Sequence, residues 1–270
     1  IAWTTTPWTV PSHLALAVNP SMKYVTVHDK KADEYYILAE SNLVNLFKKK
    51  SEYTITETCT GTDLVGTEYK QPFDYFESYR SMGAFRVYAD TFVKVSEEDE
   101  SAKKKPVGTG VVHCAPGFGA EDFNMCTKHF IPIEQIGDVC PVDENGCFTS
   151  PVEEYKGENV FSANNKILKQ LKSMGVVLKQ VNCRHKYPYC WRTDTPLIYK
   201  AVKSFFVRVT SIKDRMVELN KKIYWVPDFV GHKRFHEWLK DAKDWGISRS
   251  RFFGTPLPVW VSDDGEEMVV

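Results

Sequence analysis

A strand, a tight turn and the start of a helix follow one another in Gly108-Thr109-Gly110-Val111-Val112-His113-Cys114-Ala115-Pro116-Gly117-Phe118-Gly119-Ala120-Glu121-Asp122-Phe123. The residues before His113 have the β-branched character of a strand, and the Pro/Gly run predicts a turn where backbone approaches a ligand. Asp122 falls in the first turn of a helix expected over residues 121–129, where the helix dipole favours a carboxylate. That carboxylate could instead pair with a substrate ammonium group. The stretch therefore predicts a mixed α and β fold.

Two other functions of this stretch are disfavoured. Gly108-Thr109-Gly110 lacks the third glycine of a dinucleotide-binding fingerprint and lies inside a strand pattern. Cys114 beside His113 suggests a thiol nucleophile, but adjacent residues of a strand point to opposite faces. We therefore expect Cys114 to pack in the core.

Short strands dominate the N-terminal side of the chain. The sequence predicts a hairpin with strands over 24–27 and 35–38, and a helix over 41–47 with Ser41 as its N-cap. Residues 53–95 predict further short strands, since their β-rich segments alternate with Gly and Pro.

Helices dominate the C-terminal side of the chain. They are expected over 163–174, 212–219 and 233–240, and a proline-rich extended segment is expected over 256–261. The pattern indicates a mixed, β-dominated domain up to about Lys179 and an α/β appendage after it.

Composition and charge narrow the class of protein. The chain has 270 residues, 43% of them hydrophobic, which is typical of a globular protein with one large domain and an appendage. Its 35 basic residues balance 35 acidic ones, so a uniformly basic nucleic-acid surface is not predicted, although a local patch could still bind RNA. The charged run 96–106 predicts a solvated loop, with phosphate binding by its lysines as the alternative.

Cysteine usage and hydropathy indicate a cytoplasmic protein. Seven scattered cysteines are an odd number and do not resemble a disulfide framework, so we expect reduced thiols. No apolar run approaches the roughly 20 residues that cross a bilayer, and no membrane association is expected. Ile1 opens a strand-like segment, so we expect that the chain is part of a longer protein.

A second candidate site lies in Trp3-Thr4-Thr5-Thr6-Pro7-Trp8-Thr9, which carries four hydroxyl groups beside two indoles. Such hydroxyls could bind a ribose or position a water in a pocket. A plain threonine-rich strand is the alternative, because threonine is common in strands.

A third segment, Tyr187-Pro188-Tyr189-Cys190-Trp191-Arg192, is dense in aromatic and basic residues and could stack on RNA bases. Cys183, His185 and Cys190 could suggest a metal site. However, their spacing matches no standard zinc motif and the chain has no Cys-x-x-Cys, so no metal is expected.

Four segments, in this order, resemble the isoleucyl-tRNA synthetases of the eukaryotic cytosolic type: residues 3–12, 108–122, 187–198 and 245–258. The resemblance spans the whole chain. It implies the β-barrel-like, mixed α+β editing domain of the class I synthetases, with peripheral helices. It also implies an editing core over 1–180, a returning helical arm over 181–244, and the start of the returning Rossmann catalytic segment over 245–270.

The resemblance implies an editing hydrolase. Neither a His-Ile-Gly-His nor a Lys-Met-Ser-Lys-Ser signature is present, so this stretch should use no cofactor, whereas the whole ligase would use ATP and Mg. This family is the standard example of double-sieve editing, in which a second site hydrolyses what binding alone discriminates poorly. The implied activity is metal-independent deacylation of valine misattached to tRNA(Ile), with valyl-adenylate as a further substrate. The implied partners are the tRNA 3′ end and the rest of the synthetase in cis.

The resemblance also implies roles for individual residues. Thr4 to Thr6 would hold the terminal adenosine and the hydrolytic water, Asp122 would bind the α-ammonium group, and His113 and Phe118 would narrow the pocket against isoleucine. The full set is, for catalysis, Thr5, Thr6, His113 and Asp122, and for substrate binding Trp3, Thr4, Thr9, His13, Phe118 and Gly119.

Two positions depart from the family pattern, and two other functions remain open. His13 stands where the family has asparagine, and Thr193 stands where many bacterial relatives have a zinc-binding cysteine, so that zinc site is expected to be lost. The related valyl and leucyl synthetases carry the same kind of insertion but are expected to differ at both the threonine and the Pro/Gly motifs. A non-catalytic module that binds the tRNA 3′ end is the alternative from another class.

Overall fold

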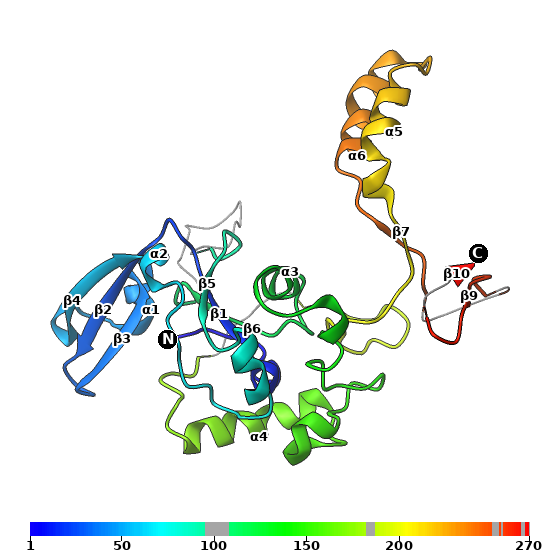
Figure 1. The fold of residues 1–270 in the computed structure, drawn as a ribbon. Helices are drawn as coiled ribbons and strands as arrows, with labels where there is room; N and C mark the ends of the chain where they lie inside the picture. Colours follow the sequence, from blue (N-terminus) through cyan, green and yellow to red (C-terminus); the bar gives the residue numbers. More distant parts are fainter. Residues whose placement is uncertain (95–107, 182–186, 250–253, 255, 266–267, 270) are drawn as a thin grey trace. The chain divides into compact units, whose positions relative to one another are not determined.

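The structure of the chain is a computed structural model that describes residues 1–94, 108–181, 187–249, 254, 256–265 and 268–269 (Figure 1). The chain divides into two compact units, Ile1–Ala201 and Val202–Val270, and each is described by itself. The charged loop expected over 96–106 lies outside the described residues. So do Cys183 and His185, two of the three candidate metal ligands.

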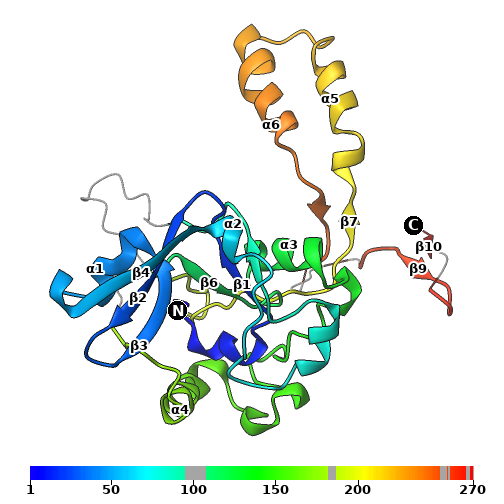
Figure 2. The same ribbon diagram turned by 60° about the vertical axis from the view of Figure 1, so that its left-hand side comes forward.

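Two three-stranded sheets form the first unit. In one, β1 (Ala15–Val18) pairs in parallel with β5 (Val87–Ala89) and antiparallel with β6 (Val111–Cys114). In the other, β2 (Lys23–Asp29) lies between β3 (Glu34–Ala39) and β4 (Tyr53–Thr60), all antiparallel (Figure 2). The expected hairpin is confirmed. Of the described residues from 53 to 94, only β4 and β5 are regular strands.

Residues 108–110, the glycine-rich segment before β6, join the two sheets. Ala39 N–H donates to Thr109 O over 2.8 Å, and the Tyr24 hydroxyl donates to Gly110 O over 2.7 Å. Gly110 has φ +77°, and a Cβ there would lie 2.4 Å from the Ala39 Cβ. Only glycine lets residue 110 approach Ala39 this closely. The glycine therefore has a structural role, although the motif superficially resembles a phosphate-binding loop.

The mixed α+β class is confirmed, but the expectation of a barrel is corrected. A closed barrel requires a strand partner on both edges of every strand. Among the described residues, β3, β4, β5 and β6 each have one strand partner, so the sheets stay open.

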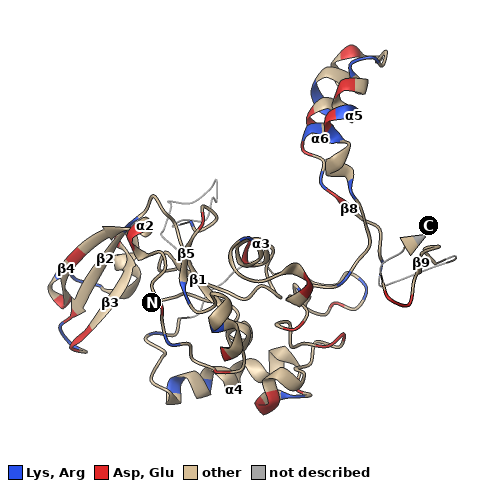
Figure 3. Ribbon diagram, in the orientation of Figure 1, with Lys and Arg blue, Asp and Glu red and all other residues tan. Residues whose placement is uncertain are grey.

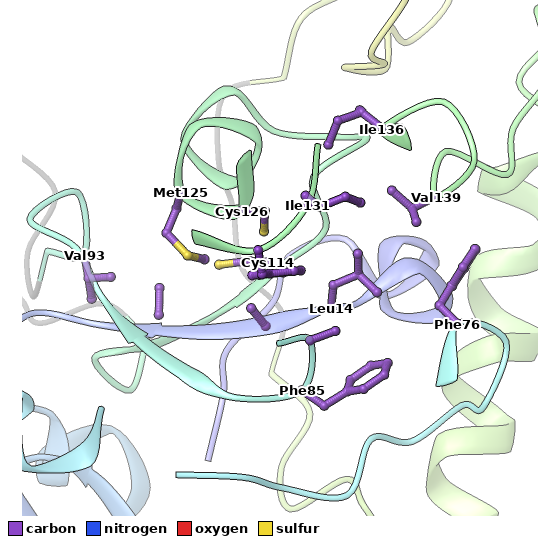
Figure 4. Packing of buried hydrophobic residues seen from close by; sticks show 14 residues of the cluster. Leu14, Phe76, Phe85, Val93, Cys114, Met125, Cys126, Ile131, Ile136 and Val139 are labelled. Carbon is purple, nitrogen blue, oxygen red and sulfur yellow. The ribbon is translucent and has the colours of Figure 1, made fainter. Parts of the chain in front are cut away.

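Helix α3 (Ala120–His129) covers the first sheet and supplies part of its core. Its buried residues Met125 and Cys126 pack against Leu14, Phe85 and Cys114 (Figure 4). Cys114 is fully buried, as expected, and burial raises the pKa of its thiol well above the ordinary value. Such a thiol remains protonated and is not a nucleophile.

Helix α4 (Val160–Ser173) lies elsewhere in the first unit. Asn159 caps it by accepting a hydrogen bond from Phe161 N–H. Its buried residues follow helical spacing and form a second core with Trp8 and Phe118: Val160, Ala163, Ile167 and Leu171. The expected helix at 163–174 is therefore confirmed, with a start three residues earlier.

Shorter helices complete this unit, namely α1 (Leu43–Leu46), α2 (Gly61–Leu64) and the 3-10 helices Pro7–Ser12, Glu40–Asn42, Lys50–Glu52, Glu77–Met82, Ile133–Gln135 and Ser150–Tyr155. The helix expected over 41–47 is split between a 3-10 turn and α1. Ser41 caps neither, because its hydroxyl donates to the Asn42 side chain instead.

The second unit is a helical hairpin with short strand pairs. Strand β7 (Phe206–Val207) pairs with β8 (Trp245–Gly246), and β9 (Trp260–Val261) pairs with β10 (Met268–Val269). Between β7 and β8 lie a 3-10 turn (Val209–Ser211), α5 (Lys213–Asn220), a π-helix (Val230–Phe235) and α6 (His236–Lys240), close to the expected helices.

The charges along helices α5 and α6 agree with the balanced composition. Figure 3 shows Lys and Arg interspersed with Asp and Glu along α5 and α6, rather than gathered in one basic stripe. Within the described part of the chain, no helix is both long and apolar enough to span a membrane.

Candidate functional site

A pocket of about 550 Å³ opens in the first unit. One wall carries Trp3, Thr4 and Thr5 together with His13 and His113. The lining also includes residues that the sequence did not single out: Tyr69, Asn164, Asn165, Leu168, Lys179 and Gln180. Parts of the chain far apart in sequence therefore meet at one cavity.

Hydrogen bonds hold the threonine segment in a compact turn. Thr6 N–H donates to the Thr4 hydroxyl over 3.0 Å, and the Thr9 hydroxyl donates to Thr6 O over 2.9 Å. Only Trp3 pairs as in a strand, with Val112, and a 3-10 helix begins at Pro7. The alternative of a plain threonine-rich strand is therefore wrong.

His113 ties this turn to the end of β6. Its Nε2 lies 2.9 Å from the Thr9 hydroxyl oxygen, although the two residues are 104 positions apart. Burial lowers the pKa of His113 to about 4, so the ring is neutral at physiological pH. A neutral ring can donate or accept a hydrogen bond but adds no charge to the pocket.

His13 lies beside His113, with ring centroids 6.0 Å apart. It is 6% exposed, and its Nε2 lies 2.6 Å from the Tyr69 hydroxyl. Burial, and then repulsion from the His113 ring when that ring is protonated, lower the pKa of His13 to about 3. The pocket wall therefore contains two neutral imidazoles.

Asp122 lies in the first turn of α3, where its Oδ2 accepts a hydrogen bond from Ala115 N–H over 2.9 Å. Burial raises the pKa of Asp122 to about 6. Gly119 allows this placement, since a Cβ there would lie 2.9 Å from the Asp122 Cγ. The carboxylate thus closes the turn after β6, which fits the helix-start interpretation and leaves ammonium binding a prediction.

The structure divides the ten expected site residues into two groups. Trp3, Thr4, Thr5, His13 and His113 line the pocket, whereas Thr6, Thr9, Phe118, Gly119 and Asp122 are not on its wall. The Thr9 hydroxyl connects both residues to the pocket wall, because it is hydrogen bonded to Thr6 O and to His113 Nε2. Phe118 packs edge-on against Trp8 in the core, with centroids 5.0 Å apart. Its narrowing of the pocket therefore stays a prediction.

Helix α4 and the segment after it provide the wall that sequence reasoning missed. The Asn164 side chain accepts a hydrogen bond from Trp8 N–H across 156 positions. Lys179 Nζ donates to Asn45 O over 2.7 Å, and both residues line the pocket. Nothing local marks these residues, because their role depends on the packing of distant segments.

Metal-ligating side chains do not cluster among the described residues. The described residues contain no group of three or more His, Cys, Asp and Glu side chains that could hold an ion. Cys183 and His185 lie outside those residues, so the metal-free expectation stays a prediction. Thr193, where the resemblance implies that a zinc-binding cysteine is lost, is hydrogen bonded to Thr195.

Comparison with known proteins gives concordant matches. Residues 8–270 match the model of the family described as tRNA synthetases class I (I, L, M and V). The chain is 47% identical over 270 residues to an isoleucine–tRNA ligase of Chlamydia pneumoniae. It is 49% identical over 275 residues to a probable cytoplasmic isoleucine–tRNA ligase of Dictyostelium discoideum. Both alignments cover all of this chain.

The chain spans about a quarter of the length of these relatives, 24% and 25% respectively. Among solved structures, it is similar to a P. knowlesi cytosolic leucyl-tRNA synthetase editing domain, with TM-score 0.40 and 13% identity. That similarity covers 73% of this chain and 83% of the other. The resemblance to isoleucyl-tRNA synthetases, inferred from four motifs, is confirmed by the sequence matches.

Proposed function

Because the chain belongs to the class I tRNA synthetases of the isoleucine, leucine, methionine and valine group, we propose that it is an editing domain that hydrolyses valine misattached to tRNA(Ile). The observation that carries this proposal is the meeting of the threonine segment with His13 and His113 at one pocket. A pocket of about 550 Å³ is large enough for an aminoacylated nucleoside rather than valine alone.

The proposed reaction is attack of water on the aminoacyl ester carbonyl, without a metal. The ester carbon–oxygen bond breaks, and the ribose hydroxyl of the tRNA leaves with a proton. The pocket would contribute positioning of the water and hydrogen bonds to the developing oxyanion. Thr5, at the pocket wall, and Thr6, one residue on, carry hydroxyl groups suited to this role.

Asp122 would bind the α-ammonium group of the misattached valine. The first turn of α3 holds its carboxylate just beyond the strand that carries His113. At pH 7.5 this carboxyl is ionised, since its pKa is about 6. A partly buried carboxylate with one backbone hydrogen bond pairs strongly with an ammonium ion.

The test compares valyl-tRNA(Ile) with isoleucyl-tRNA(Ile) and follows the loss of each ester. We expect the 270-residue chain to hydrolyse the valyl ester faster, and Asp122→Ala to lose this activity. Glu121→Gln is the matched control, because Glu121 is the exposed neighbour in the same helical turn. Equal loss of both esters, or hydrolysis unaffected by Asp122→Ala, would refute the proposal.

If neither ester is lost above background, calorimetry with a non-hydrolysable valyl-adenosine analogue decides between two causes. Binding of the analogue would show that the pocket is correct and that the rest of the synthetase supplies contacts to tRNA. No binding would refute the assignment of this pocket.

A second candidate, non-catalytic binding of a tRNA 3′ end, is favoured by one other observation. Trp191 is 83% exposed on a turn closed by the hydrogen bond from Cys190 N–H to Thr195 O, and Tyr199, which follows this turn, is 71% exposed. The Arg192 guanidinium lies 4.6 Å from the Trp191 ring centroid. Exposed rings with a cation suit base stacking. Under this function, Asp122→Ala would leave tRNA affinity intact, whereas Trp191→Ala would reduce it.

A further inference from the structure

The ring of His13 is held in the pocket wall by one polar contact, its hydrogen bond with Tyr69. The Tyr69 oxygen lies 2.6 Å from His13 Nε2, and both residues line the pocket. The other ring nitrogen, Nδ1, is buried and has no hydrogen-bond partner among the described residues. The Tyr69 hydroxyl is therefore the group that sets the rotation of this ring.

The direction of that hydrogen bond follows from counting hydrogens. Burial keeps His13 neutral and raises the pKa of the Tyr69 phenol far above its ordinary value, so each group carries one hydrogen. If Tyr69 donates to Nε2, only the Nδ1–H of His13 is left without a partner. If the His13 Nε2–H donates instead, both the Tyr69 hydroxyl hydrogen and the His13 Nδ1 lone pair are left without a partner. The first arrangement leaves fewer buried polar groups unsatisfied.

One packed aromatic wall is formed by the rings of His13, His113, Tyr69 and Phe85. His13 lies 5.4 Å from Tyr69 and 6.0 Å from His113, centroid to centroid. Tyr69 in turn packs edge-on against Phe85, which is fully buried in the core. The wall is thus continuous from the pocket surface to the rigid interior. A pocket that discriminates by one methylene group needs such a wall, because a shift below 1 Å would admit the larger side chain.

We propose that Tyr69 is a positioning residue for substrate selection, which fixes the His13 ring beside His113 so that the wall excludes the longer side chain of isoleucine. This role rests on the proposed editing function. A neutral histidine needs such a partner, because its hydrogen-bonding state depends on which ring nitrogen carries the hydrogen.

The test measures the ratio of kcat/KM for valyl-tRNA(Ile) to that for isoleucyl-tRNA(Ile). Tyr69→Phe keeps the ring but removes the hydroxyl, and should lower the ratio about ten-fold. Tyr88→Phe is the matched control, because it removes a comparable hydrogen bond, to Gly83 O over 2.8 Å, away from the pocket. It should leave the ratio unchanged. A Tyr69→Phe variant with both rates reduced by one factor, and the ratio intact, would overturn the inference.

A second background separates positioning from general damage. Tyr69→Phe should change the ratio in the unaltered chain but not in a His13→Asn chain, where no imidazole remains to be oriented. An equal effect in both backgrounds would overturn the inference, since Tyr69 would then act without His13.

A spectroscopic readout is independent of activity. Two-bond ¹H–¹⁵N spectra of the ¹⁵N-histidine-labelled chain should show His13 as the Nδ1–H tautomer, and Tyr69→Phe should mix the two tautomers. An Nε2–H tautomer in the unaltered chain would overturn the inference even if editing is confirmed. Conversely, failure of the chain to hydrolyse either ester or to bind the valyl-adenosine analogue would overturn the editing function and the selection role together, whatever tautomer is found.

Discussion

At the residue scale, Asp122 combines a cost to stability with a proposed role in binding. Burial raises the pKa of its carboxyl from the ordinary 3.8 to about 6 in the fold, so the folded chain binds the proton more tightly. Between these two values, stability falls as pH rises, because the unfolded chain loses its proton first. Above pH 6, the fold bears the full cost of a partly buried charge.

Replacing Asp122 with asparagine should therefore stabilise the chain while removing its activity. The amide oxygen can still accept the hydrogen bond from Ala115 N–H, and no buried charge remains. We expect a gain of about 1 kcal/mol at pH 7.5, less than the pKa shift alone implies, because partial exposure screens the charge. Urea unfolding measures the gain, and unchanged or lower stability would contradict this account of the carboxyl.

The same carboxyl predicts the pH dependence of hydrolysis. An ammonium group binds the ionised carboxylate, so kcat/KM for valyl-tRNA should fall as pH drops through about 6. His13 and His113 stay neutral through this range, since their pKa values lie near 3 and 4. A pH profile between 5 and 8 with a flat response would show that Asp122 does not bind the substrate in its ionised form.

Gly110 is the residue whose lack of a side chain joins the two sheets. Gly110→Ala introduces positive-φ strain and an overlap with Ala39, and should cost about 2–4 kcal/mol of unfolding free energy. Gly66→Ala is the matched control, because Gly66 has φ +84° and nothing within 4 Å of an added Cβ. It should cost only about 1–2 kcal/mol, for the backbone strain alone. Equal losses in urea unfolding would show that the crossing tolerates a methyl group.

At the element scale, α4 serves both the core and the pocket. Its buried face packs on Trp8, while Asn164 and Leu168 line the cavity. Asn159→Ala removes the N-cap hydrogen bond to Phe161 N–H and should cost about 1 kcal/mol. Asn165→Ala, at an exposed position of the same helix beside the pocket, should cost less in urea unfolding, because alanine is the better helix former. A greater loss from Asn165→Ala would contradict the capping role.

At the scale of the whole molecule, every residue that lines the pocket belongs to the first unit. A fragment of residues 1–201 should therefore bind a non-hydrolysable valyl-adenosine analogue with the Kd of the 270-residue chain. Calorimetry compares the two proteins. A Kd weaker by more than about ten-fold would show that residues 202–270 complete the site.

The sequence by itself determined the local elements and the family. Strand, turn and helix followed from residues 108–129, the alternation along β6 placed Cys114 in the core, and helical spacing marked α4. These features are set by hydrogen bonds and side-chain periodicity within a few residues, so they can be read locally. Four ordered motifs indicated the synthetase family, which the sequence matches then confirmed.

Only the tertiary structure decided which side chains share the pocket. Tyr69 meets His13 across 56 positions and Asn164 meets Trp8 across 156, and no local pattern marks either pair. Asp122 is in the expected helical turn, yet its carboxylate faces the Ala115 N–H rather than the pocket wall. The open sheets, in place of the expected barrel, likewise depend on which strand edges find partners. Such contacts depend on how the whole chain packs, because every segment competes for the same buried space.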